Sequence, residues 1–224
     1  MTNFIDLDTL HMPSIEQART WYNDADPVHD FEHVLRVYRI AEKLAIAEKA
    51  DLEIVRAAAL LHDSVGSAPG GNGEERAEHH VASAEFAAQV LQAEGWSEER
   101  IQAVQHCIRA HRFRHNGEKP LTLEAQVLFD ADKLDVLGAI GVARTIAYAA
   151  LDGQPAYAEP SALFLQTGQE EPGEVHSSYH EYLFKLRKVK DLMFTESGKL
   201  LAEARHAYLV TFYEELQAEC RGEQ

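Results

Sequence analysis

The sequence predicts an all-α fold, a single compact helical bundle. Apolar residues recur at spacings of three and four along most of the 224-residue chain. No segment shows the alternation of apolar and polar residues that marks a half-buried strand, and no internal repeat or linker divides the chain. With 46% apolar residues, the chain can form a core without disulfides or structural zinc. We therefore expect residues 1–224 to form one domain.

The first long helix is expected between Pro27 and Ala50, where apolar side chains form one stripe. Asp26 followed by Pro27 suits an N-cap and a first helical residue, and Asp30 is the alternative cap one turn later. Further helices, each with an acidic or hydroxyl residue near its first turn, are predicted over residues 51–63, 74–95, 97–112 and 122–153, with a bend in the last at Gly138 and Gly141.

Residues 152–175 break this pattern, because prolines and glycines interrupt short apolar pieces. We expect a long loop here, either a lid over a pocket or a surface excursion. Two closing helices are predicted within residues 176–221, separated near Thr195.

Composition excludes several classes of protein. The chain holds 21 basic and 37 acidic residues, and a net charge of −16 argues against binding of polymeric nucleic acid. No apolar run approaches the roughly 18 residues that a membrane span needs, and the N-terminal residues lack the layout of a signal peptide. Two cysteines, Cys107 and Cys220, fit neither a disulfide framework nor a CxxC metal site. We expect a cytoplasmic protein without a membrane partner; the sequence does not indicate its oligomeric state.

The pair His62-Asp63, which ends the apolar run AAALL, is the sharpest local feature. A neutral imidazole nitrogen and a carboxylate oxygen at one point suit a divalent cation. His33 lies on the first long helix, and Asp132 lies in the segment LFDADKLDVLG. This pattern resembles the H…HD…D signature of the HD-domain metal-dependent phosphohydrolases. The segments HDFEHVLRV, AALLHD, HHVASAEFA, ADKLDVLGAIGVAR and GKLLAEARHAYL resemble one bacterial branch of that superfamily over nearly the whole chain.

The resemblance implies that His33, His62, Asp63 and Asp132 bind one divalent metal ion and leave positions open for water and substrate. Mn²⁺ or Mg²⁺ is favoured, although Fe, Co, Ni and Zn are compatible with the same ligands. Asp130 is the competing acid. Two residues rotate a helical side chain by about 200°, so Asp130 and Asp132 cannot both point inward, and the ADKL context matches the family at Asp132.

The implied activity is hydrolysis of a phosphoester or phosphoanhydride by a metal-activated water. The expected substrate is a small phosphorylated metabolite, with a nucleotide first, and a nucleoside triphosphate pyrophosphohydrolase is our first choice. Some relatives carry an acid shortly after the HD pair, whereas here the sequence reads HDSVG. The proton acceptor is therefore expected to be Asp63 or a nearby histidine, with His80 and His111 as candidates.

Further histidines and cations are candidates for substrate contact. His79 and His80 are adjacent, so only one of them can face the pocket; the family context slightly favours His80. His106 and His111 diverge by about 140° on an ideal helix, so both reach the site only if the helix ends between them. The substrate-binding candidates are Arg36, His79, His106, Lys133, His180 and Lys185.

Two other functions stay open. The missing acid after the HD pair favours a non-catalytic module that binds a metal or a nucleotide as a sensor or scaffold. A cyclic-nucleotide phosphodiesterase would require a second metal ion.

Overall fold

The structure is a computed structural model that describes residues 12–22, 31–65, 73–113 and 117–223, with the backbone alone for residues 73–78. Every regular element within these ranges is helical, which confirms the all-α prediction. The chain divides into two compact units, residues 1–129 and 130–224. The single domain that the sequence predicts stays a prediction.

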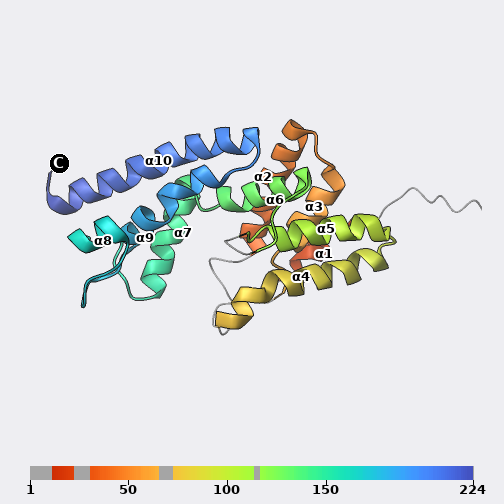
Figure 1. Ribbon diagram of the computed structural model, residues 1–224, viewed down its shortest axis with the longest axis horizontal. Helices are drawn as coiled ribbons and strands as arrows, with labels where there is room; N and C mark the ends of the chain where they lie inside the picture. The colour runs from red at the N-terminus through yellow and green to blue at the C-terminus, as the bar shows by residue number, and fades with distance from the viewer. Residues whose placement is uncertain (1–11, 23–30, 66–72, 114–116, 224) are drawn as a thin grey trace, which may run out of the picture. The chain divides into compact units, whose positions relative to one another are not determined.

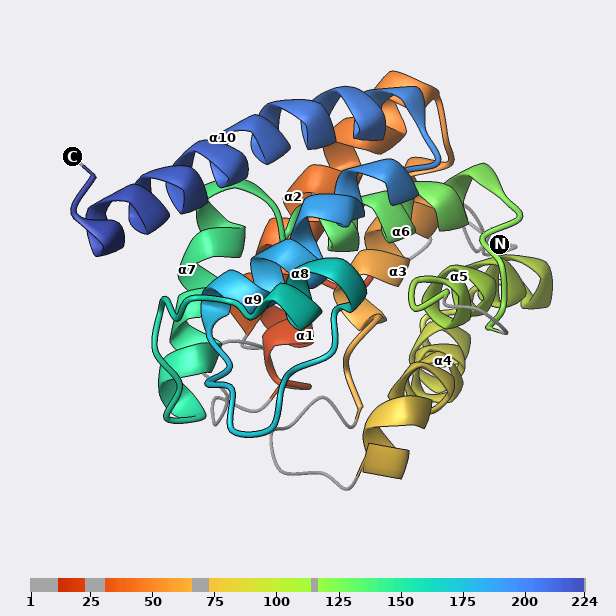
Figure 2. The ribbon, with the colours of Figure 1, turned by 60° about the vertical axis from the view of Figure 1, so that its left-hand side comes forward.

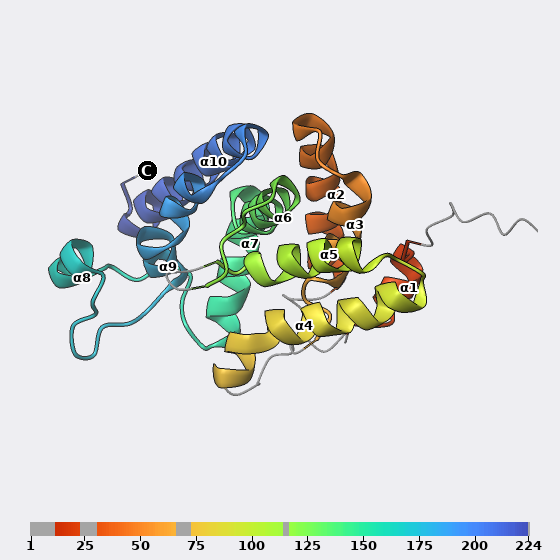
Figure 3. The same ribbon diagram turned by 45° about the vertical axis from the view of Figure 1, so that its right-hand side comes forward.

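The first unit holds helices that follow one another closely along the chain (Figure 1). They are α1 (Ile15–Arg19), α2 (Phe31–Glu48), α3 (Leu52–Leu61), α4 (Gly73–Ala93), α5 (Glu98–Ala110) and the first part of α6 (Leu123–Leu134). Helix α3 packs against α2 and α5, and α4 lies alongside α5 (Figure 3). The alternative caps at Asp26, Pro27 and Asp30 lie outside the described residues.

Helix α3 is the centre of the first unit because its sequence is almost entirely apolar. The Asp51 carboxylate caps its start by accepting hydrogen bonds from the N–H groups of Glu53 and Ile54 at 3.1 and 3.2 Å. The helix then buries its side chains from Ala57 to Leu61 completely. At its other end the Tyr22 hydroxyl donates to the Leu60 carbonyl at 2.8 Å, which satisfies a carbonyl left open by the helix end.

The second unit holds the end of α6 and the remaining helices. These are α7 (Gly138–Leu151), α8 (Ala162–Thr167), α9 (Ser178–Phe184), the 3₁₀ helix η1 (Leu186–Leu192) and α10 (Glu196–Arg221). Helix α10 packs against α7 and η1 (Figure 2). The predicted helix over 122–153 breaks at residues 135–137, just before Gly138, rather than bending at Gly138 and Gly141. The separation near Thr195 is confirmed, since Thr195 is the N-cap of α10.

The segment 152–175 is more ordered than the predicted loop. Ser161 caps the short helix α8 by accepting from the Phe164 N–H at 3.0 Å. The Glu174 carboxylate accepts hydrogen bonds from the N–H and hydroxyl of Ser161 and from the N–H of Glu171, each at 2.7 Å. These bonds tie the segment to itself, and they explain why the pKa of Glu174 falls to about 2.

Among the described residues, no single helix is long and apolar enough to cross a membrane. The bent pair α6 and α7 meets the same criteria together, by length and composition only.

Candidate metal centre

The HD pair lies at the carboxyl end of α3, as the sequence predicts. His62 is the C-cap of that helix and is fully buried. Its Nδ1 lies 2.8 Å from the carbonyl oxygen of Ala59. Because a carbonyl can only accept, Nδ1 carries the proton and Nε2 presents a lone pair. The end of α3 therefore fixes His62 in the tautomer that a metal ligand needs.

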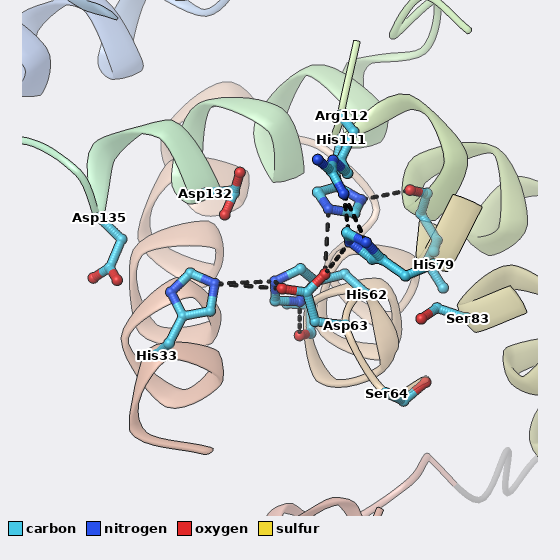
Figure 4. Close-up of polar contacts among 12 residues, drawn as sticks. His33, His62, Asp63, Ser64, His79, Ser83, His111, Arg112, Asp132 and Asp135 are labelled. Atoms are coloured by element: carbon cyan, nitrogen blue, oxygen red, sulfur yellow. Dashed lines mark hydrogen bonds and ion pairs between the residues drawn. The ribbon is translucent and has the colours of Figure 1, made fainter. Parts of the chain in front are cut away.

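His33 approaches the HD pair from α2 (Figure 4). It lies on the buried face of that helix, at 3% exposure, and its Nε2 is 3.4 Å from His62 Nε2. Asp63 Oδ2 is 3.6 Å from His62 Nε2 and 3.8 Å from His33 Nε2. Two imidazole nitrogens and one carboxylate oxygen thus converge from two helices.

The other oxygen of Asp63 faces a second pair of histidines. Asp63 Oδ1 lies 3.1 Å from His79 Nε2 and 3.5 Å from His111 Nε2. His111 is the C-cap of α5, and its Nδ1 lies 2.6 Å from the Ile108 carbonyl oxygen. His111 therefore repeats the arrangement of His62, with a protonated Nδ1 and a lone pair on Nε2.

This donor set fits a bound cation. Asp63 Oδ1 is buried and makes no well-oriented hydrogen bond to the described residues. The Nε2 lone pairs of His62 and His111 face the Asp63 carboxylate, so three groups that can only accept hydrogen bonds lie close together. This arrangement is unfavourable unless a positive charge lies among them. Burial alone would raise the pKa of Asp63, but the surrounding imidazoles of His62, His111 and His79 outweigh burial and hold that pKa well below its usual value. The carboxylate is therefore ionised and ready to bind a metal.

The two competing acids of α6 differ in what they contact within the second unit. Asp130 is fully buried, and its carboxylate accepts from the N–H of Phe194 at 2.9 Å and from the N–H and hydroxyl of Thr195 at 2.8 and 2.6 Å. Asp132 pairs with Lys133 at 2.7 Å and is 17% exposed. Because these hydrogen bonds occupy Asp130, it serves the packing of the second unit, and Asp132 stays the predicted ligand.

The structure corrects the sequence-based choice between the two adjacent histidines. His79, not His80, faces Asp63, and the His80 ring lies 6.1 Å from the His79 ring, measured between centroids. The buried Nδ1 of His80 has no hydrogen-bond partner among the described residues. Burial, together with the neighbouring imidazoles of His111 and His79, lowers the pKa of His80. The two histidines lie one position apart on α4, and the sequence alone does not show which of them faces Asp63.

His106 makes other contacts than those expected of a substrate ligand. Its Nδ1 lies 2.5 Å from Glu118 Oε1, and its Nε2 accepts from the Leu121 N–H at 3.2 Å. Helix α5 ends at Ala110, after His106 and before His111. The helix end that the sequence requires is present, but only His111 is brought to Asp63.

In the second unit, the predicted substrate-binding residues His180 and Lys185 contact neighbouring side chains. His180 is fully buried, with Nδ1 at 2.8 Å from Ser177 Oγ and Nε2 at 3.2 Å from Glu174 Oε1. Lys185 is exposed and lies 3.5 Å from Glu181. Both ring nitrogens of His180 thus contact protein groups, Ser177 and Glu174, and a phosphate contact by His180 stays a prediction. Arg36, in the first unit, is half-buried on α2.

Two residues near the HD pair escape the sequence-based search. Arg112 directly follows His111, and its Nη1 lies 2.7 Å from His79 Nδ1. Tyr22 holds the end of α3 through Leu60. The run HRFRH gave a signal for Arg112, since it places an arginine beside a candidate histidine. Tyr22 gave none, because its partner is a backbone carbonyl far along the chain.

Comparisons with known proteins agree with this arrangement. The family model of the HD domain matches residues 30–137, which include His33, His62, Asp63 and Asp132. The chain is 32% identical to the protein YpgQ of Bacillus subtilis over 214 residues, covering 92% of this chain and 94% of YpgQ.

Solved structures extend the similarity to the fold. The crystal structure of Bacillus subtilis YpgQ in complex with ADP has a TM-score of 0.69 and 29% identity, covering 92% of this chain and 94% of that one. An HD-superfamily hydrolase from Bacillus thuringiensis has a TM-score of 0.67 and 30% identity, covering 92% of this chain and 96% of that one. These similarities show that the chain belongs to the HD-domain superfamily, which also includes the hydrolase from Bacillus thuringiensis.

Proposed function

We propose that this protein is a metal-dependent phosphohydrolase of a nucleotide, with a nucleoside triphosphate pyrophosphohydrolase as the first choice. The observation that carries the proposal is the convergence of His33, His62 and the ionised Asp63 at the end of α3. The complex of the relative YpgQ with ADP supports a nucleotide as the ligand.

The proposed ligands of the metal ion are His33, His62, Asp63 and Asp132. Two neutral imidazoles and two carboxylates balance the charge of a divalent ion. Because the ion accepts more ligands than these four, positions stay open for a substrate oxygen and water. Mn²⁺ or Mg²⁺ is the proposed ion. When bound, it would supply an activated water and polarise a phosphoryl group.

The chain's own residues would orient this chemistry and accept its proton. The carbonyl of Ala59 fixes the His62 ring, so that ligand enters the reaction without reorientation. His111 presents an unprotonated Nε2 at the same carboxylate, so it can accept a proton there. We propose His111 and Asp63 as the candidate bases, with His79 rather than His80 as the third polar group beside Asp63.

A panel of nucleoside mono-, di- and triphosphates, assayed with Mn²⁺, Mg²⁺ and Co²⁺, tests the proposal. We expect turnover of triphosphates to monophosphate and pyrophosphate above the metal-only blank. Release of orthophosphate from diphosphates would favour a different phosphohydrolase. Tight nucleotide binding in calorimetry without turnover would favour a non-catalytic sensor.

One observation favours a second candidate, a phosphodiesterase with two metal ions. Asp63, His79 and His111 each offer a ligand atom, and these atoms lie within 4.8 Å of one another. Asp63, His79 and His111 would then hold a second ion, which would supply additional charge stabilisation for phosphodiester hydrolysis. Elemental analysis that finds two ions per chain, together with hydrolysis of cyclic nucleotides, would favour this candidate over the first.

A further inference from the structure

A pocket of about 670 Å³ lies within the second unit, where residues of α8, α9, η1 and the middle of α10 line it. Its wall includes the buried rings of Phe164 and Tyr182 and the half-exposed ring of Phe184. This volume is typical of pockets that hold one small molecule. None of the proposed ligands of the metal ion lines it, so the metal centre does not explain this pocket.

The Phe184 ring is held in place although it is 52% exposed. Phe184 is the last residue of α9, and its ring packs closely against Gly168, where a Cβ would lie 2.5 Å from two of the ring carbons. The ring centroid is 6.5 Å from that of Phe164. Phe184 therefore offers the pocket a fixed aromatic surface, against which a flat ring can pack.

Positive charge adjoins this aromatic surface. Lys188 lines the pocket, and its Nζ lies 4.9 Å from the centroid of the Phe184 ring. Arg187 also lines the pocket. Within the described part of the chain, neither of these cations forms an ion pair, whereas Lys190 pairs with Glu203 at 2.7 Å. A pair of cations without carboxylate partners can bind an anion.

The acidic residues of the lining do not cancel this charge. Lys190 lies 3.2 Å from Asp191, so these two lining residues neutralise each other. Arg187 and Lys188 then outnumber Glu214, the other carboxylate of the lining. In a chain with a net charge of −16, this excess of positive charge makes the pocket a local exception.

His206 adds a polar group that has no partner. It lines the pocket from α10, and its buried Nδ1 makes no hydrogen bond to the described residues. Buried polar atoms are almost always paired, so this nitrogen still requires a partner. A water molecule or a polar group of a ligand can supply one.

We propose that this pocket binds a nucleoside phosphate, with the phosphate on Arg187 and Lys188 and the base against the exposed part of Phe184. An inorganic anion would make no use of the aromatic ring, and an uncharged apolar molecule would make no use of the cations. A nucleoside phosphate carries both the ring and the anion that this lining matches. The site does not depend on the proposed function, because it shares no residue with the proposed metal ligands.

Calorimetry with AMP in the presence of EDTA tests the site, because no metal ion then contributes to binding. We expect one AMP per chain, bound equally well by Asp63→Ala. Arg187→Gln should weaken AMP binding about 10-fold, as for the loss of a hydrogen bond to a charged group. Phe184→Leu should weaken it about 3- to 10-fold and leave the binding of inorganic phosphate unchanged. Arg221→Gln is the matched control, since Arg221 does not line the pocket and its Nε donates to Glu159 at 3.1 Å.

Amide chemical shifts locate bound AMP without any substitution. We expect the largest changes at Gly168, Phe184 and Lys188. Largest changes around His62, no AMP binding without a metal ion, or unchanged AMP affinity in Arg187→Gln would overturn the proposal. An equal loss in Arg221→Gln, or benzoate binding as tight as that of AMP, would also contradict it. Turnover with Mn²⁺ measures the proposed function separately, so either proposal can fail while the other holds.

Discussion

Asp130 Oδ2 accepts hydrogen bonds from both the backbone N–H and the side-chain hydroxyl of Thr195, at 2.8 and 2.6 Å. Thr195 in turn caps α10 by accepting from the Gly198 N–H at 3.0 Å. One buried carboxylate therefore joins the end of α6 to the start of the longest helix of the second unit. This relationship separates two aspartates that differ by only two positions in sequence.

Asp130→Ala should lower the free energy of unfolding by about 2–4 kcal/mol, because the N–H groups of Phe194 and Thr195 lose their acceptor in a buried place. Urea unfolding of the metal-free protein measures the loss. Asp132→Ala is the matched control: its partly exposed carboxylate should affect metal-free stability little but weaken Mn²⁺ binding. The reverse pattern would make Asp130 the ligand.

Gly198→Ala should destabilise the same junction by about 1–3 kcal/mol through overpacking. A Cβ at this position would lie 2.3 Å from Asp130 Oδ2 and 2.7 Å from Thr195 Oγ1, too close for either oxygen to stay in place. Thermal unfolding measures this effect. A stable Gly198→Ala protein would show that the contact between Asp130 and Thr195 can shift at little cost.

His79→Gln should reduce kcat/KM more than His80→Gln does, by about 10-fold or more, because His79 alone of the pair contacts Asp63. Steady-state kinetics with one triphosphate and saturating Mn²⁺ gives the comparison. Both positions lie on α4, so a general weakening of that helix would affect the two variants alike. A larger loss in His80→Gln would restore the choice that the family context favours.

Glu174 should make the stability of the second unit sensitive to acid. Hydrogen bonds from Ser161 and Glu171 lower its pKa from 4.5 to about 2. A carboxylate with a depressed folded-state pKa contributes stability above pH 4.5, and this contribution is lost as the pH falls from 4.5 towards 2. Glu174→Gln should therefore lose less stability than the wild type over this range in urea titrations. Parallel acid profiles for the two proteins would contradict the assignment.

The sequence predicts the long helices well, because their apolar stripes and caps are local. Asp51 and Thr195 mark helix starts that the structure confirms. The short helices α1 and α8 were missed, since five or six residues hold too little of a helical period to be distinguished from a turn. The break after α9 at Lys185 was missed for the same reason, because the 3₁₀ helix that follows continues nearly the same spacing.

In the candidate site, too, local features could be predicted from the sequence and features set by packing could not. The HD pair and His33 follow from residue types and a family resemblance, and the structure brings them together. Which of His79 and His80 faces Asp63 depends on the rotation of α4, and the contact between Arg112 and His79 depends on where α5 ends. Both features are set by packing between helices, and no single segment of the sequence determines that packing.

The most direct test of the central claim is chromatographic analysis of the products formed from a nucleoside triphosphate with Mn²⁺ by the wild type and Asp63→Ala. Circular dichroism confirms that the variant is folded. The account predicts monophosphate and pyrophosphate from the wild type and no product above the metal blank from the variant. Equal turnover by the two proteins, or none by the wild type, would contradict a phosphohydrolase centred on Asp63.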